Sequence, residues 1–295
     1  MQLTLFGDMT MQSRQSKIVN VASVPQRSPF RYPGGKTWLI PTVREWLKQV
    51  QAVELLIEPF AGGGIVSLTA AFENLSNHIM MVELDEEIAA VWKVILKDKN
   101  NWLADKILNF ELTLDNVNKE LSNTNKDTKE LAFCTILKNR IYHGGIIAKG
   151  SGMIKHGENG KGIASRWYAK TLSDRIRAID FVKHKINFIQ ADALKVIEKN
   201  SMNKKAFFFI DPPYTVAGKR LYTHFDIDHE KLFYLISKIE GKIMLTYDDT
   251  EEIRQLADKY KLSFRTIPMK TTHHLEKNEI IISDNFSWWT KNSFI

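Results

Sequence analysis

The tetrapeptide Asp211-Pro212-Pro213-Tyr214 combines residue types that suit one kind of chemistry. It follows the apolar run AFFFI (206–210), which predicts a buried strand, and two prolines end that strand because they lack the donors that a sheet needs. The aspartate can accept hydrogen bonds from an amino group while the tyrosine stacks on the ring that bears it. Ligands bind at the carboxyl ends of strands in open α/β sheets. The alternative interpretation is a strand-ending turn with an aspartate cap.

A glycine-rich turn, EPFAGGG (58–64), lies at the end of another predicted strand and directly before a predicted helix. Three glycines let the backbone turn tightly and approach a ligand without a Cβ in the way. The next predicted strand ends near Glu83 and Asp85, about 20 positions later, where a ribose-bearing ligand finds an acceptor for its hydroxyls. The alternative is that both acids cap the helix that begins near Glu86.

A third segment, RYPGGKT (31–37), contains Gly-Lys-Thr, which invites a phosphate-loop interpretation. That loop needs a glycine at position 30, where this chain has Phe30. A lysine on a glycine turn can equally hold a carboxylate. Lys36 therefore fits a ligand with an amino-acid tail better than a nucleotide phosphate.

The elements that must position these residues alternate between strands and helices. Such alternation predicts parallel βαβ units and an α/β fold. The predicted strands span 53–60, 78–84, 185–192, 206–214 and 242–249, with two later candidates at 264–269 and 278–284. The predicted helices span 65–75, 86–98, 228–240 and 250–260, and region 101–141 is mostly helical.

The charge of the chain is concentrated in one segment. The 295 residues carry a net charge of +7, and residues 138–185 hold eleven lysines and arginines against three acids, a net of +8. The remainder carries −1, so the basic character belongs to one surface and indicates a polyanionic partner such as nucleic acid. A hydrophobic fraction of 44% is ordinary for a globular protein and excludes wholesale disorder.

The same basic segment is rich in glycine, with seven of the chain's 15 glycines between 144 and 162. A glycine-rich basic loop adds little to a packed core, which predicts a specialised surface between two α/β portions.

Residues 1–27 are polar and without sustained period, and we predict a flexible tail there. The single cysteine, Cys134, excludes an internal disulfide and a multi-thiolate metal site, and no metal centre is predicted. Without a bilayer-spanning run or signal peptide, we expect a cytoplasmic protein.

Taken together, these motifs resemble the bacterial DNA adenine-N6 methyltransferase family, the group that includes the Dam-type methylases. The resemblance covers roughly residues 28–284. Its motifs appear in family order: YPGGK (32–36), EPFAGGG (58–64), VELD (82–85), KNRIYHGG (138–145), QAD (190–192), DPPY (211–214), LTYDD (245–249) and a late acidic strand around Glu279.

The resemblance implies a Rossmann-like sheet that binds S-adenosyl-L-methionine, with helices on both faces and an inserted, mostly helical target-recognition region. The implied catalytic domain spans 28–100 and 185–295, and the insert spans 101–184. Lys36 would pair with the methionine carboxylate of the cofactor, Glu83 would accept from its ribose and Asp192 would lie near its adenine. The implied cofactor site also includes Tyr32, Gly35, Glu58, Phe60, Gly62, Gly64 and Asp211.

By the same resemblance, Asp211, Pro212, Pro213 and Tyr214 would receive a target base flipped out of double-stranded DNA. The implied DNA-binding residues are Arg140, His143, Lys149, Lys155, Lys161 and Arg166. Arg140 has an alternative role, because the Asn139-Arg140 pair lies on a predicted helix and can brace the loop from inside. Where family members often carry an aromatic residue and Asn-Gly, this chain has His143 followed by two glycines.

The predicted function is site-specific methylation of adenine N6 in DNA. Methylation of cytosine N4 or of RNA adenine stays open, because the same acceptors serve any exocyclic amine, and so does a non-catalytic DNA-binding regulator on a methylase fold. The four residues Lys36, Glu83, Asp211 and Tyr214 are all present, which weighs against an inactive protein. We expect a monomer or weak dimer that does not bind membranes, with a cognate restriction endonuclease as a candidate partner.

Overall fold

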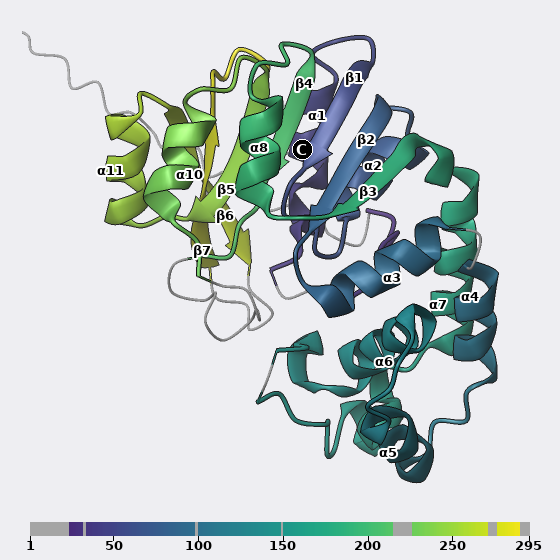
Figure 1. Cartoon of the computed structure of the whole chain (residues 1–295). Helices are drawn as coiled ribbons and strands as arrows, with labels where there is room; N and C mark the ends of the chain where they lie inside the picture. Colours follow the sequence, from purple (N-terminus) through teal and green to yellow (C-terminus); the bar gives the residue numbers. More distant parts are fainter. Residues whose placement is uncertain are drawn as a thin grey trace, which may run out of the picture.

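The computed structural model describes residues 24–31, 34–97, 100–148, 150–214, 226–270 and 276–289, and a seven-stranded sheet forms its centre (Figure 1). The strand order is β3-β2-β1-β4-β5-β7-β6. The strands are β1 (Val53–Glu58), β2 (Ser76–Glu83), β3 (Ile186–Gln190), β4 (Ala206–Ile210), β5 (Lys242–Asp248), β6 (Ser263–Lys270) and β7 (Glu276–Ser283). Strands β1 to β5 pair in parallel, and β7 is antiparallel to both β5 and β6. The predicted α/β fold is confirmed.

Helices cover both faces of this sheet. One face carries α1 (Ile40–Leu47), α2 (Ile65–Phe72) and α3 (Glu86–Leu96), and the other carries α8 (Ala193–Asn200), α10 (His229–Ile236) and α11 (Glu251–Lys259) (Figure 1). The side chains of β4 alternate between the two faces and are buried on both. Phe207 and Phe209 join the buried cluster on the first face, while Phe208 and Ile210 join the cluster on the second. A strand buried on both faces needs a continuous apolar run, and AFFFI supplies one.

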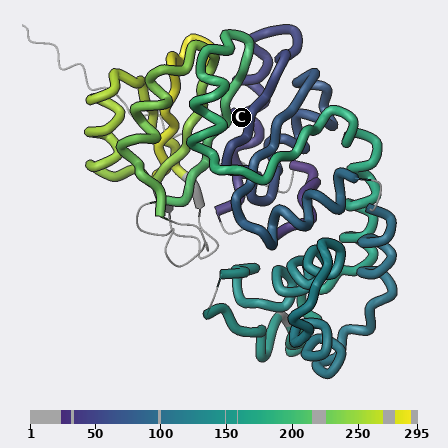
Figure 2. The backbone as a smooth tube through the Cα atoms, in the orientation of Figure 1, coloured from purple at the N-terminus to yellow at the C-terminus, as the bar shows by residue number. Residues whose placement is uncertain are grey.

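Among the described residues, four α-helices follow α3 and precede β3. They are α4 (Asn100–Asn109), α5 (Leu114–Ser122), α6 (Thr128–Ile141) and α7 (Ala169–Ala178). Figure 2 shows the chain leaving the sheet after α3, running through this helical region and returning to β3. Helix α6 packs against α3, and α7 packs against α4. Asp127 begins α6 with a capping box that includes Glu130, which fixes where the helix starts.

The chain packs against the core earlier than the sequence predicts. The predicted tail ended at residue 27, but Val24 is 3% exposed within the first buried cluster. Arg27 pairs with Glu73 at 3.2 Å, and Glu73 also receives two hydrogen bonds from Arg44. Residues 24–27 therefore belong to the packed part of the chain, and residues 1–23 lie outside the described residues. Across the described residues, no helix has the length and apolar character needed to cross a membrane.

Candidate functional site

The predicted site residues lie at one edge of the sheet. Glu58 ends β1, Glu83 ends β2 and Asp211 follows β4, and these three strands are neighbours that run in parallel. Their carboxyl ends therefore meet. A cavity of about 1390 Å³ opens there, and it is lined by all three acids together with residues of α6, α7 and the loop between them.

The glycine turn after β1 is held by backbone and side-chain hydrogen bonds. The Gly62 amide donates to Oε2 of Glu83 at 3.0 Å, and the Ser28 hydroxyl donates to the Gly63 carbonyl at 2.5 Å. Gly64 adopts φ +61°, and a Cβ there would lie 2.6 Å from the end of the Met81 side chain and 2.9 Å from the rigid Trp92 ring. Glycine is needed at this position on both counts.

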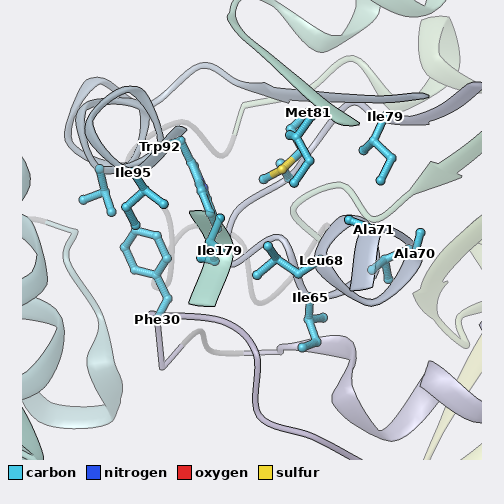
Figure 3. Close-up of a cluster of buried hydrophobic side chains, with 14 of the residues drawn as sticks. Phe30, Ile65, Leu68, Ala70, Ala71, Ile79, Met81, Trp92, Ile95 and Ile179 are labelled. Atoms are coloured by element: carbon cyan, nitrogen blue, oxygen red, sulfur yellow. The ribbon is translucent and has the colours of Figure 1, made fainter. Parts of the chain in front are cut away.

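A buried aromatic cluster supports that turn from behind. The Trp92 indole N–H donates to the Gly62 carbonyl at 2.8 Å, so a residue of α3 fixes the loop. The Phe30 and Trp92 rings lie side by side with centroids 5.8 Å apart, near Ile65 and Leu68 of α2 (Figure 3). The turn thus keeps its shape through apolar packing that the sequence motif alone does not reveal.

Glu83 holds the turn and still has acceptor capacity. Its Oε1 accepts from the amides of Leu84 (2.8 Å) and Asp85 (3.0 Å), and its Oε2 accepts only from Gly62 among the described contacts. A carboxylate offers about four acceptor positions, so one is left for a ligand hydroxyl. Burial raises the pKa of Glu83 to about 7, although the amide donors favour its charged form.

Two of the other acids on this edge act as helix caps. The Asp85 carboxylate accepts from the amides of Glu87 and Ile88 and begins α3, so the capping alternative holds for Asp85. Asp192 caps α8 through the Lys195 amide at 3.1 Å and also lines the cavity.

Glu58 differs from these caps because it is only 3% exposed. Its Oε2 accepts from the Ser67 amide at 2.9 Å. Burial raises the pKa of Glu58 to about 8, against the opposing hydrogen bond from Ser67. Burial therefore favours the neutral form of Glu58 where it lines the cavity.

Asp211 is fixed by two donors on one of its oxygens. The Lys36 Nζ lies 2.8 Å from Oδ1 of Asp211, and the Thr246 hydroxyl donates to the same oxygen at 2.8 Å. Lys36 is 3% exposed and also donates to the Gly34 carbonyl at 2.9 Å. Burial acts to lower the pKa of the Lys36 amine, but the nearby carboxylates of Asp211 and Glu279 outweigh it and raise the pKa.

Tyr214 packs against the sheet beside Asp211. Its hydroxyl donates to Oε2 of Glu279 at 3.1 Å, and its ring stacks on Tyr247 with centroids 5.6 Å apart. Pro213 and Asp211 line the cavity, whereas Tyr214 does not. The sequence motif places the tyrosine next to Asp211, but its contacts with Glu279 and Tyr247 depend on strands that follow much later in the chain.

The opposite wall of the cavity is rich in arginine. Arg31, Arg140, Arg166 and Arg175 all line it, together with His143. Arg140 is 4% exposed, and its Nη2 donates to the Pro29 carbonyl. Burial and the positive charges of Arg175 and Arg31 together lower the pKa of Arg140 to about 10. Arg31 and Arg175 were not predicted, because neither belongs to the glycine-rich loop.

Asn139 joins the start of the chain to the glycine-rich loop. Its Oδ1 accepts from the Arg31 amide at 2.8 Å, and its Nδ2 donates to the carbonyls of Arg31 (2.9 Å) and Gly145 (2.8 Å). A Cβ at Gly145, where φ is +77°, would lie 2.4 Å from the Arg31 carbonyl oxygen. The bracing role proposed for the Asn139-Arg140 pair therefore fits Asn139 directly.

The remaining predicted residues divide into three groups. Gly35, Phe60, Gly62 and Gly64 line the cavity. Lys155 and Lys161 are exposed on the loop and are not among the residues that line it. Tyr32 and Lys149 lie outside the described residues. Tyr168 is 55% exposed on the cavity wall, although an aromatic pair such as Trp167-Tyr168 usually indicates core packing.

Similar solved structures include three proteins of low sequence identity. A SAM-dependent methyltransferase from Agrobacterium tumefaciens is 10% identical over 83% of this chain and 60% of that one, with a TM-score of 0.39. Spermidine synthase from Thermotoga maritima is 10% identical over 95% and 63%, with a TM-score of 0.38. Precorrin-6y C5,15-methyltransferase from Geobacter metallireducens is 11% identical over 83% and 85%, with a TM-score of 0.35. A comparison with curated proteins gives no match.

The sheet order, the glycine turn after β1 and the acid that ends β2 form a Rossmann-like sheet with the arrangement expected of a methyltransferase that uses S-adenosyl-L-methionine. Residues 32–275 match the D12 class N6 adenine-specific DNA methyltransferase family, and the chain belongs to that family. The predicted enzyme class, cofactor and DNA substrate are confirmed.

Proposed function

We propose that this enzyme methylates the N6 amine of an adenine turned out of duplex DNA, and that Asp211 and the Pro212 carbonyl accept the two hydrogens of that amine. One observation carries the proposal. Asp211 opens onto the same cavity as the glycine turn on one side and the arginine-rich wall on the other. This arrangement supports adjoining binding surfaces for the cofactor, the target base and the DNA backbone within one site.

The residues around the glycine turn fit the cofactor. Glu83 has one acceptor position left for a ribose hydroxyl, and Gly62 presents backbone without a side chain. Pockets for small ligands usually occupy roughly 300–1,000 Å³. The cavity here is about 1390 Å³, so it has room for a cofactor and a base together. When bound, S-adenosyl-L-methionine supplies a methyl group on a positively charged sulfur.

Asp211 works by accepting hydrogen bonds and holding the amine in place. The N6 lone pair of adenine is delocalised into the ring and is a poor nucleophile, and acceptors on both N6 hydrogens help to localise it. Because Lys36 and Thr246 occupy Oδ1, the Oδ2 of Asp211 is the oxygen available to the amine. Positioning and electrostatics then supply most of the acceleration, and no strong base is needed, since the proton leaves readily once nitrogen is cationic.

The arginine-rich wall supports a role for residues 101–184 in gripping DNA. Flipping a base costs a few kcal/mol, and contacts to phosphates and stacking on an aromatic ring offset that cost. Tyr214 is a partly exposed residue near Asp211, which supports its predicted stacking role, although its ring stacks on Tyr247 and does not line the cavity. Lys155 and Lys161 are exposed and lie in the same segment between α6 and α7 as Arg166, which suits contacts with DNA phosphates.

Transfer of labelled methyl groups to DNA tests this proposal. The protein is incubated with tritiated cofactor and plasmid that lacks adenine methylation, and the nucleosides are separated. We expect label in N6-methyladenine, and label in N4-methylcytosine or none at all would overturn the proposal. Asp211→Ala should abolish transfer while cofactor affinity, measured by fluorescence titration, largely survives. Asp284→Asn, which breaks a surface pair with Lys242 on the same sheet, is the control.

We propose a monomer as the catalytic unit, because the glycine turn, Asp211 and the arginine-rich wall all meet at one cavity within a single copy of the chain. Sedimentation of the protein with and without a DNA duplex tests this part of the proposal, and an active species found only as a dimer would contradict it. The cognate restriction endonuclease and the cytoplasmic location stay predictions from the sequence.

A further inference from the structure

We propose that Glu279 is a positioning residue for methyl transfer, which neutralises the Lys36 ammonium so that the surroundings of Asp211 stay negative. The inference rests on the proposed role of Asp211. Glu279 lies beyond residues 32–275, which match the family, and the late acidic strand that the sequence indicates around Glu279 does not predict its contacts.

The antiparallel direction of β7 brings Glu279 into the site. If β7 ran parallel to β5, its last residues would lie at the carboxyl end of β5. Because β7 is antiparallel, its first residues lie there instead. The register pairs Asp248 with Glu279 and Tyr247 with Ile280. A residue near the start of β7 therefore reaches the same edge as Asp211, where it is 4% exposed.

Glu279 contacts two side chains that adjoin Asp211. Its Oε2 lies 3.9 Å from the Lys36 Nζ and accepts a hydrogen bond from the Tyr214 hydroxyl at 3.1 Å. The Lys36 Nζ also lies 5.0 Å from the centre of the Tyr214 ring. Lys36 is thus shared between two carboxylates, one at 2.8 Å and one at 3.9 Å.

The charge count explains why a second carboxylate is useful. Methyl transfer places positive charge on the adenine amine, and a negative site stabilises it. Lys36 paired with Asp211 alone would cancel that negative charge, because a buried ion pair is nearly neutral to its surroundings. With Glu279 ionised, these three side chains carry one net negative charge. Burial raises the pKa of the Glu279 carboxyl, and the nearby Lys36 ammonium opposes that rise and favours the charged form. Asp248 is the next acidic group, and it acts on Lys36 less strongly than Asp211 or Glu279 does.

A double-mutant cycle between Glu279 and Lys36 separates this role from general support of the fold. Glu279→Gln keeps an acceptor for the Tyr214 hydroxyl but removes the charge, and it should slow single-turnover methyl transfer about 10- to 100-fold. In a Lys36→Met background the same change should cost less than about threefold, because Asp211 alone keeps the site negative once the ammonium is gone. Equal losses in both backgrounds would overturn the proposal. Tyr214→Phe, which removes only the hydroxyl contact, should slow transfer less than Glu279→Gln does.

A titration of Lys36 measures the electrostatic coupling between Glu279 and Lys36 without any methyl transfer. The side-chain resonance of Lys36 in protein with ¹³C-labelled lysine is assigned by its loss in Lys36→Met. We expect its pKa to fall by about one pH unit in Glu279→Gln. An unchanged titration would refute the inference even if the enzyme methylates adenine. A wild type that leaves adenine unmodified would instead refute the proposed function, while the titration still reports on the pair.

Glu279→Asp guards against a variant that does not fold. It keeps the charge near Lys36 but is shorter by one methylene, so it should retain more than about a third of the wild-type rate and the raised pKa of Lys36. If Glu279→Asp were as slow as Glu279→Ala, side-chain length rather than charge would be what matters, and the proposal would be wrong.

Discussion

The Nζ of Lys36 and the Oδ1 of Asp211 lie 2.8 Å apart, so the glycine-lysine turn and the Asp-Pro-Pro-Tyr turn form one unit. The sequence resemblance implied that Lys36 pairs with the methionine carboxylate of the cofactor. In the structure the amine is 3% exposed and already engaged by Asp211. Lys36 therefore orients the Asp211 carboxylate. A cofactor carboxylate would have to share the Lys36 ammonium with Asp211.

Lys36→Met should slow methyl transfer more than it weakens cofactor binding. Removal of the ammonium leaves Thr246 as the one remaining donor among the described partners of Asp211 Oδ1, and a misplaced acceptor costs about 100-fold in rate. We expect the Kd of the cofactor, measured by isothermal titration, to change less than about threefold, well under one tenfold step of 1.4 kcal/mol. A large rise in Kd with little change in single-turnover rate would support the role that the sequence implied. Lys48→Met, on the surface after α1, serves as the control.

Asn139→Ala should destabilise the protein, because Asn139 is 1% exposed and joins three backbone groups. Its side chain pairs with the amide and carbonyl of Arg31 and with the carbonyl of Gly145. A buried polar group left without a partner costs about 1–3 kcal/mol. Because water reaches some of the three backbone groups, we expect the free energy of unfolding to fall by roughly 2–4 kcal/mol in total. Urea denaturation measures this loss. Asn101→Ala on the exposed face of α4 should stay within about 0.5 kcal/mol of wild type, and an equal effect of both changes would contradict the bracing role.

The sequence predicted the residues whose position follows from strand order alone. Glu58, Glu83 and Asp211 each follow an apolar run that forms a parallel strand, so a common edge follows once the fold is α/β. The glycine turn was recognisable because close approach requires residues without a Cβ. These arguments use only local sequence and the direction of the strands.

The contacts of Lys36 and Glu279 depend on information that local sequence does not contain. A buried lysine is satisfied equally by a ligand carboxylate or by Asp211, and only the three-dimensional packing decides between them. The arrival of Glu279 requires both the antiparallel direction of β7 and its register with β5. A shift of one residue would have turned Glu279 to the other face of the sheet.

Glu58→Gln should stabilise the protein at alkaline pH and leave it unchanged at acidic pH. The folded-state pKa of Glu58, about 8, lies above its ordinary value of 4.5. The folded protein therefore holds the proton more tightly than the unfolded chain, and stability falls as pH rises from about 4.5 through 8. Glutamine does not titrate and escapes this loss, so at pH 9 we expect it to be more stable by about 2–4 kcal/mol. Thermal unfolding at pH 5 and pH 9 measures the difference. Glu54→Gln, at an exposed position on the same strand, should show no such dependence.

Arg140→Met distinguishes the two roles that the sequence left open for Arg140, DNA contact and internal brace. Burial and two neighbouring arginines disfavour its charge in the folded protein, where the pKa is about 10. Replacing a poorly compensated buried charge with an apolar side chain of similar size often stabilises a protein by about 1–4 kcal/mol. We therefore expect Arg140→Met to unfold at higher urea while binding a DNA duplex at least about tenfold more weakly, since the arginine-rich wall loses a charge. Lys161→Ala, at an exposed position, should leave stability unchanged and lower the slope of log affinity against log salt by about 1. A less stable Arg140→Met with normal DNA affinity would identify Arg140 as a brace.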